Sequence, residues 1–351
     1  AKNSGVTDFS HPLYGSGPEP DIPDYIFPPR AKEGDPSVDP SLYDDKMTHE
    51  DGDDTYLIMR ANKEGTDWLR EADRNAFFLE ANLGLTGGSE KTVYSFQASY
   101  LNEEGILKWT GFDRYNLRSN VTSNPTDWLE IGERVGITYS ESYGNQGNHA
   151  EDAVVSWCYR MPPIVPVYDI MGNYAGTRAP GTGNARNPIF LLDTNQWDKR
   201  KRMNISGNAY AQINFLEGFS ARTTFGFFHT SYFYRNIDYV EKAFSERGTY
   251  DYLGEGSNYT LQWNWTNILE YTNTFANLHR VTAMVGTEAI DNNYRYTDAS
   301  RSEFFSKDPN YIQLATGLRG IGNGGNTSSW SLFSVFGRLN YSYANKYFFE
   351  G

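Results

Sequence analysis

The chain has 351 residues, a formal net charge of −13, and an aromatic content of 16%. An acidic chain without a basic cluster is a poor nucleic-acid binder, because phosphate contacts depend on lysine and arginine. No apolar run approaches the ~20 residues of a membrane-spanning helix. A single cysteine, Cys158, excludes an internal disulfide framework and a thiolate metal cluster. A spanning β-barrel stays possible, because its strands alternate lipid-facing and lumen-facing residues and are polar on average.

Two regions differ in character. Residues 1–73 are rich in proline, aspartate and glycine, and they are expected to form an irregular extracellular loop region before the second barrel strand. Residues 74–351 show apolar–polar alternation with a period of two, which is typical of β-strands. The alternating runs lie at 77–86, 94–100, 114–121, 131–139, 203–215, 219–227, 259–274, 280–288 and 330–343, and a last run begins at 347.

The connections between these runs alternate in length. Short turns are expected near 87–91, 124–128, 216–218, 275–278 and 344–346, and longer segments near 102–112, 141–200, 236–257 and 291–329. Strands of about ten residues with short turns at one end and long loops at the other are the layout of outer-membrane barrels. The sequence therefore predicts an all-β, antiparallel transmembrane barrel whose extracellular loops include 141–200, 236–257 and 291–329.

The two faces of the expected strands carry different chemistry. Inward positions hold Asn, Gln, Ser, Thr and Arg, whereas outward positions hold Leu, Val, Ile, Ala and Phe. An interfacial aromatic girdle is predicted near the strand ends. Its members are Tyr94, Tyr100, Tyr139, Trp263, Trp265, Tyr341 and Tyr343. Glu133 is an acidic residue on the expected lipid face. It lies close to a short turn, where a charge on that face is only slightly destabilising.

An ordered series of motifs resembles the SusC-like family of TonB-dependent outer-membrane transporters from Bacteroidetes-type bacteria. The motifs are GGSEKTVYS (87–95), YLNEEG (100–105), FDRYNLR (112–118), DWLEIG (127–132), RNPI (186–189), GNAY (207–210), FGRLNYSY (336–343) and KY (346–347). The resemblance covers about residues 66–351.

The resemblance implies a twenty-two-stranded barrel with a plugged lumen, opened by TonB and capped by a SusD-like surface lipoprotein. Because the chain starts at Ala1 and stops in the pattern at Gly351, we expect it to be a piece of a longer protein. The plug domain, the TonB-contacting segment, the first strand and the C-terminal strands are expected to lie outside it.

Two sets of candidate site residues follow from the expected faces. Aromatic rings near the strand ends and loops are candidates for stacking on substrate, with girdle or loop packing as the alternative: Trp109, Trp157, Tyr232, Tyr234 and Trp330. Lumen arginines are candidates for docking the plug or for binding anionic substrate groups, and plug docking is favoured: Arg114, Arg118, Arg134 and Arg222.

The long segment 141–200 is expected to fold on itself or to line the substrate cavity. Residues 151–160 can form a short helix with Val154, Trp157 and Cys158 on one side, and 166–176 reads as a small hairpin. The glycine-rich run 320–325 is expected to be a flexible loop tip.

Neither catalysis nor metal binding is indicated. The five histidines are scattered without metal-ligand spacing, and no Gly-x-Ser-x-Gly elbow or phosphate-binding loop occurs in a suitable context. The acidic run 50–54 lacks the spaced ligand pattern of a calcium loop. No cofactor is expected.

The functional hypothesis is TonB-dependent import of a nutrient across the outer membrane, most readily an oligosaccharide, together with a SusD-like lipoprotein. A peptide importer of the same family is the main alternative. From other classes, an outer-membrane barrel enzyme and a soluble carbohydrate-binding β protein are also considered.

Overall fold

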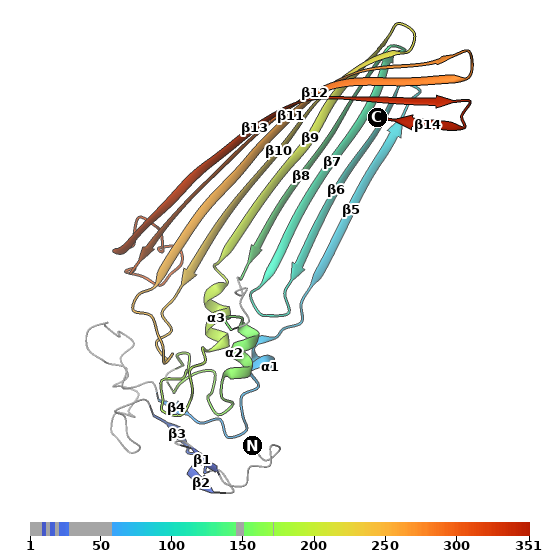
Figure 1. The fold of residues 1–351 in the computed structure, drawn as a ribbon. Helices are drawn as coiled ribbons and strands as arrows, with labels where there is room; N and C mark the ends of the chain where they lie inside the picture. The colour runs from blue at the N-terminus through green and yellow to red at the C-terminus, as the bar shows by residue number, and fades with distance from the viewer. Residues whose placement is uncertain (1–8, 12–14, 18–20, 28–57, 145–150, 171) are drawn as a thin grey trace.

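A computed structural model describes residues 9–11, 15–17, 21–27, 58–144, 151–170 and 172–351. One antiparallel sheet of ten strands dominates it, and each strand pairs with its neighbours in the chain (Figure 1). The strands are β5 (Phe78–Gly88), β6 (Thr92–Glu104), β7 (Gly111–Thr126), β8 (Leu129–Tyr143), β9 (Lys199–Phe215), β10 (Phe219–Asp238), β11 (Tyr252–Phe275), β12 (His279–Ser302), β13 (Arg319–Tyr343) and β14 (Tyr347–Glu350). The predicted all-β antiparallel class is confirmed.

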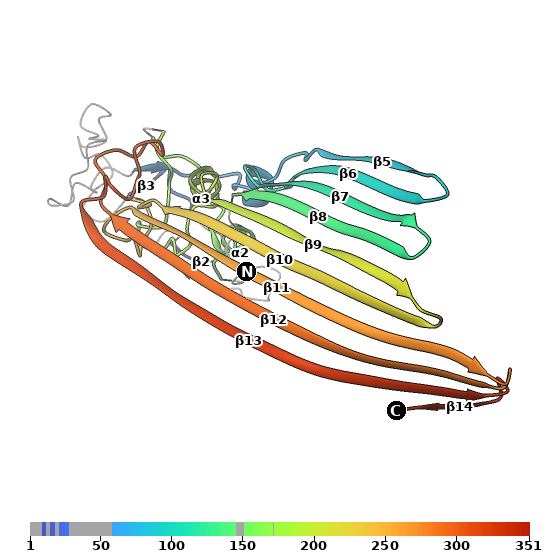
Figure 2. The same ribbon diagram turned by 90° about the horizontal axis from the view of Figure 1, so that it is seen from above.

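The smaller elements gather at the long-loop end of the sheet and to one side of it (Figure 2). They are the strand pairs β1 (Phe9–His11) with β2 (Gly15–Gly17) and β3 (Tyr25–Ile26) with β4 (Met59–Arg60), and the helices α1 (Trp68–Ala72), α2 (Val154–Arg160) and α3 (Pro188–Asn195). No helix among the described residues is long and apolar enough to cross a membrane.

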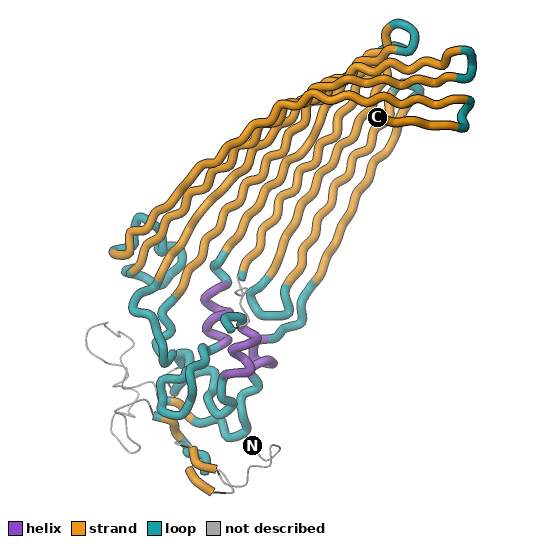
Figure 3. Tube along the Cα trace, in the orientation of Figure 1, coloured by secondary structure: helices purple, strands orange, loops and turns teal. Residues whose placement is uncertain are grey.

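Tight turns connect the strands at the opposite end (Figure 3). In two of them both central residues have positive φ, at Ala276–Asn277 and Ala344–Asn345. This is the type I′ geometry, whose twist matches that of the flanking antiparallel strands. The turns thereby set the register of each hairpin.

The register separates an apolar face from a polar face. One cross-strand row on the apolar face contains Val121, Glu133, Ala209, Phe225, Trp265, Ala289 and Phe333. Side chains on this face are exposed even on the central strands, with 49% of Phe225 and 50% of Trp265 uncovered. So large an exposed apolar surface needs a nonpolar surrounding, and lipid supplies it for an outer-membrane barrel. Glu133 lies on this face, only four residues from the start of β8, and accepts a hydrogen bond from Ser119.

The longest strands, β11 to β13, exceed what a membrane crossing requires. At about 3.3 Å per residue and a tilt of about 45°, the 25 residues of β13 rise about 60 Å, roughly twice the hydrocarbon thickness. On β12 and β13 the apolar face keeps its character only near the turns and then gives way to Asp291, Asn293 and Ser331. The distal halves of these strands therefore extend beyond the lipid.

Two expected loops are shorter than the sequence indicated. The segment 236–257 contracts to 239–251, and 291–329 contracts to 303–318, because β11, β12 and β13 continue into them. Outside the lipid both faces of a strand are solvated, so the alternation disappears while the backbone ladder continues. The run 320–325 is likewise not a loop tip but part of β13. A Cβ at Gly322 would lie 2.2 Å from the Ser300 hydroxyl across the ladder, so a larger residue there would require that hydroxyl to rotate away.

We predict that Phe225→Arg destabilises the full-length barrel by roughly 2–4 kcal/mol, since it places a charge near mid-depth on the lipid face. Phe228→Arg is the matched control, because Phe228 lies on the polar face of the same strand, opposite Ser206 and Gln262. Urea unfolding in lipid vesicles measures both. Equal destabilisation by the two variants would contradict the assignment of faces.

Candidate functional site

The four predicted arginines lie together on the polar face of the sheet. Arg118, Arg134 and Arg222 line one hollow of about 590 Å³ with asparagine, glutamine and serine side chains. Arg114 and Arg118 line an adjacent hollow of about 400 Å³. The sheet thus brings together residues that are more than 100 positions apart in the sequence.

These arginines have few internal partners. None of the four forms an ion pair with a carboxylate among the residues that the structure describes. The Arg222 guanidinium lies 3.8 Å from the ring centroid of Tyr210, whose hydroxyl donates to Glu130 at 2.8 Å. The buried Nε of Arg114 has no acceptor within the described part of the chain. The patch therefore presents positive charge and hydrogen-bond donors on the polar face of the sheet.

Three of the aromatic candidates lie on strands rather than in loops. Tyr232 and Tyr234 are neighbours on the polar face of β10, with ring centroids 6.2 Å apart, and Arg202 lies 5.4 Å from the Tyr232 ring. Trp330 lies on the polar face of β13, in the same cross-strand row as Arg118. The row of Trp330 is four residues nearer the short turns than the row of Tyr232, so the candidates do not form a single cluster.

Two tyrosines that sequence reasoning missed extend this surface. Tyr294 and Tyr296 on β12 share the face and the distance from the short turns with the β10 pair, and their centroids are 6.2 Å apart. Tyr296 is directly opposite Asn258, which is opposite Tyr232. The alternation of tyrosine with Asn293 and Arg295 is the available signal, but it lies within 291–329, where the sequence predicts a loop.

The remaining two candidates, Trp109 and Trp157, belong to a folded loop domain, defined here as residues 58–75, 105–110, 151–198, 239–251 and 303–318. Trp157 on α2 is only 7% exposed, with Arg160 stacked 4.2 Å from its ring centroid and Phe244 at its edge. Trp157 therefore packs in the core of this domain. The expected helix with Val154, Trp157 and Cys158 on its buried side is present, and so is the hairpin, closed by a bridge between Tyr168 and Tyr174.

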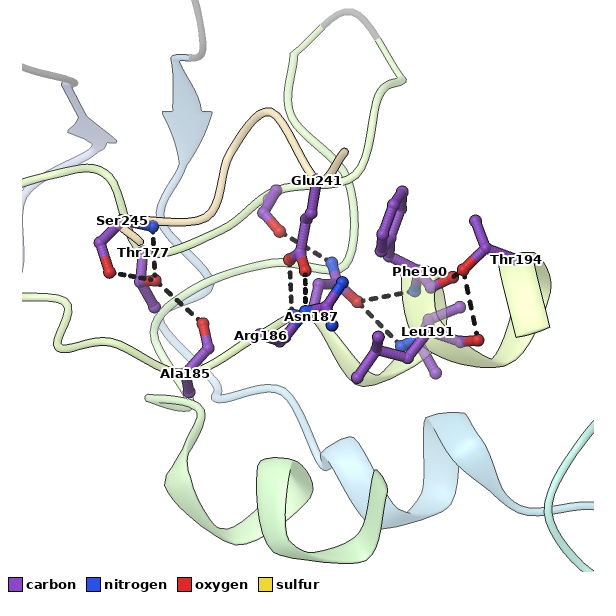
Figure 4. Close-up of polar contacts among 11 residues, drawn as sticks. Thr177, Ala185, Arg186, Asn187, Phe190, Leu191, Thr194, Glu241 and Ser245 are labelled. Atoms are coloured by element: carbon purple, nitrogen blue, oxygen red, sulfur yellow. Dashed lines mark hydrogen bonds and ion pairs between the residues drawn. The ribbon is translucent and has the colours of Figure 1, made fainter. Parts of the chain in front are cut away.

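Asn187 is the polar centre of the loop domain (Figure 4). Its fully buried side chain donates to the carbonyls of Val167 and Ala175, at 3.0 and 2.8 Å, and its Oδ1 accepts from the Ile189 and Phe190 amides that begin α3. One side chain thus caps a helix and holds the hairpin against it.

Glu241 ties this centre to the next loop. It accepts from the Asn187 amide at 2.7 Å and from Arg186 Nε at 3.0 Å (Figure 4). Burial raises the pKa of the Glu241 carboxyl, and the neighbouring Arg186 works in the opposite direction.

At the end of the same domain, burial raises the pKa of Asp198 to about 7, although its carboxylate accepts a hydrogen bond from the Ile237 amide.

Two observations on the described residues bear on metal binding and on nucleophilic chemistry. Within the described residues, no group of three or more His, Cys, Asp or Glu side chains is placed to hold a metal ion. Cys158 is buried and its pKa is raised to about 11, which disfavours the thiolate. The acidic run 50–54 lies outside the described residues.

We predict that Asn187→Ala lowers the local stability of the loop domain by about 2–4 kcal/mol. The substitution removes a helix cap and leaves the Val167 and Ala175 carbonyls without their hydrogen-bond donor. Limited proteolysis of 151–198 in the full-length protein reports the effect. Asn184→Ala is the control, since the hydrogen bonds of the exposed Asn184 side chain within the described residues go to the Arg160 and Glu246 side chains. Identical cleavage rates for both variants would show that Asn187 does not hold this domain.

No family model matches the chain. It is 29% identical over 297 residues to "TonB-dependent receptor P26" of Formosa agariphila, and 25% identical over 312 residues to "TonB-dependent receptor P3" of the same species. These alignments cover 80% and 84% of this chain but only 28% and 29% of the two receptors. The chain thus spans less than a third of the relatives it matches.

Solved structures show the same fold. Two structures of RagAB, described as a peptide transporter and as a peptide importer in its closed-closed state, align with TM-scores of 0.65 and 0.66 at 20% identity. The alignments cover 82% and 90% of this chain, and 32% and 35% of the chains compared. Together with the receptor relatives, they bear out the resemblance predicted from the motifs: this chain is similar in sequence to TonB-dependent receptors and shares with the RagAB structures the fold of an outer-membrane barrel wall.

Proposed function

We propose that this barrel imports a nutrient across the outer membrane in a TonB-dependent cycle, with a SusD-like lipoprotein closing its outer mouth. The observation that carries the proposal is the polar face, where arginines and tyrosines line the wall of a sheet whose other face suits lipid. The named relatives are receptors and importers, which favours transport over the barrel-enzyme alternative. The exposed apolar face argues against the soluble alternative.

An oligosaccharide is the cargo we favour. The polar face offers Tyr232, Tyr234, Tyr296 and Trp330, whose rings can stack on the apolar C–H faces of sugars, alongside many amide and hydroxyl groups that can bond sugar hydroxyls. Peptide is the second candidate, because the RagAB structures are described as those of a peptide importer. At 20% identity that likeness supports the fold and leaves cargo to experiment.

Gentle-detergent purification of the full-length protein from native outer membranes, followed by mass spectrometry, tests the proposal. We expect a surface lipoprotein and a bound glycan to co-purify. Bound peptides would show that the cargo is a peptide rather than a glycan, and they would leave the proposed TonB-dependent import unchanged. A barrel without any lipoprotein would contradict the lidded importer, and fractionation into the soluble phase without detergent would contradict the whole proposal.

The arginine patch has a second proposed role, which is to seat the plug. Arg118, Arg134 and Arg222 lie within eight residues of the short turns, in the half of the barrel nearest the periplasm. Charge-assisted hydrogen bonds from these side chains to acceptors on the plug each contribute about 1.5–3 kcal/mol. Seating a plug in this way closes the lumen until TonB pulls.

We predict that replacing Arg118 and Arg134 by glutamine in the full-length protein loosens the plug and makes cells several-fold more sensitive to a large antibiotic that intact outer membranes exclude. The control is Arg295→Gln, which removes an arginine from the other face of the sheet and far from the short turns. Antibiotic sensitivity at matched expression is the measurement. If the double variant excludes the antibiotic as well as the control does, the patch does not seat the plug.

A further inference from the structure

A cluster of rings around one carboxylate lies on the loop domain, apart from the polar face of the sheet. We call Trp109, Tyr168, Tyr174 and Asp193 the Trp109 cluster. Its members come from three segments: the loop between β6 and β7, the small hairpin, and α3. Trp109 was a candidate from the sequence, whereas the other three residues become neighbours only in the fold.

Asp193 organises the cluster. Its Oδ1 accepts from Trp109 Nε1 and its Oδ2 accepts from the Tyr174 hydroxyl, each at 2.5 Å. The Tyr168 ring lies 5.4 Å from the Tyr174 ring, and Tyr174 meets Phe190 of the buried core edge-on at 5.4 Å. The rings thus form a series that leads from the core of the loop domain to its surface.

The backbone that carries Trp109 is fixed before any ligand arrives. Trp109 has a φ of +63°, a left-handed conformation that is uncommon for a bulky residue and is found where the surrounding structure imposes it. The Lys108 amide donates to the Ala72 carbonyl of α1. On the other side, a Cβ at Gly144 would lie 2.2 Å from the Trp109 carbonyl oxygen, so the chain passes very close to it. The indole is therefore preorganised, which lowers the entropic cost of binding.

The exposed parts of the cluster define its chemistry. Trp109 is 45% exposed and Tyr168 is 48% exposed, so both present ring surface to solvent. Each carboxylate oxygen of Asp193 accepts one bond within the cluster and has capacity for a second. Flat electron-rich rings beside a hydrogen-bond acceptor suit a sugar, because its C–H face stacks on a ring while its hydroxyls donate to the carboxylate.

We propose that the Trp109 cluster is a binding subsite for a neutral oligosaccharide, with Trp109 and Tyr168 as stacking platforms and Asp193 as the acceptor that orients a sugar hydroxyl. This inference rests on the proposed import of an oligosaccharide and adds a site at the outer mouth. A basic peptide is the rival ligand, because aromatic rings and a carboxylate also attract cations. The sugar is favoured because two neutral donors already disperse the charge of Asp193 and hold it between the rings.

The test is calorimetric titration of the purified full-length complex with linear glucose hexasaccharides of α-1,4 and β-1,3 linkage, and with a lysine-containing decapeptide. We expect hexasaccharide binding that Tyr168→Ala weakens about three- to ten-fold, the range for losing one aromatic contact. Trp109→Phe keeps a ring but loses the bond to Asp193, and we expect a similar loss. Binding of a neutral sugar should be nearly unchanged between 0.1 and 1 M salt, because screening acts on charges.

Tyr159→Ala is the control, since Tyr159 on α2 is 75% exposed in the same domain and outside the cluster. Unchanged hexasaccharide affinity in Tyr168→Ala and Trp109→Phe would overturn the subsite while leaving oligosaccharide import standing. Salt-sensitive binding of the decapeptide, lost in the same variants, would overturn the sugar assignment. Failure of the wild-type complex to bind any hexasaccharide would also overturn it. Uptake of the co-purified nutrient by cells then decides separately whether the proposed import fails.

Discussion

Everything in this structure depends on pairing the backbone where no water is available. Within lipid each N–H and C=O has to bond to the neighbouring strand, and the continuous meander from β5 to β13 does this without a crossover. Once that ladder is fixed, the period of two determines which residues meet lipid and which meet the lumen. Arg118 and Phe225 owe their opposite surroundings to this parity alone.

The same constraint explains where sequence reasoning succeeds and where it fails. Inside the lipid the environment of the two faces differs sharply, so alternation is strong and the strands, short turns and Glu133 exception were predictable. Beyond the lipid both faces are wet, and the ladder of β12 and β13 continues through Asn293 and Gly322 without any apolar pattern to reveal it. Tyr294 and Tyr296 were missed for that reason.

The loop domain was less predictable because its contacts join distant segments. The helix at 154–160 and the hairpin at 166–176 are local, and their signals are visible in the sequence. The hub formed by Asn187 and Glu241 is not, because it links residues 54 positions apart through bonds to main-chain groups. Nothing in the residue type of Asp193 indicates that Trp109, 84 positions away, will donate to it.

The proposed import would place complementary requirements on the structure, namely rigidity at the mouth and mobility in the lumen. A cargo captured outside gains most affinity from surfaces that are already ordered, and a domain held by buried bonds from Asn187 provides such a surface. The lumen arginines lack carboxylate partners among the described residues, so their hydrogen bonds are available to a group that comes and goes. In the proposed plug-seating role, a wall that satisfied Arg118 and Arg134 internally would leave no donors for a plug that docks and leaves again.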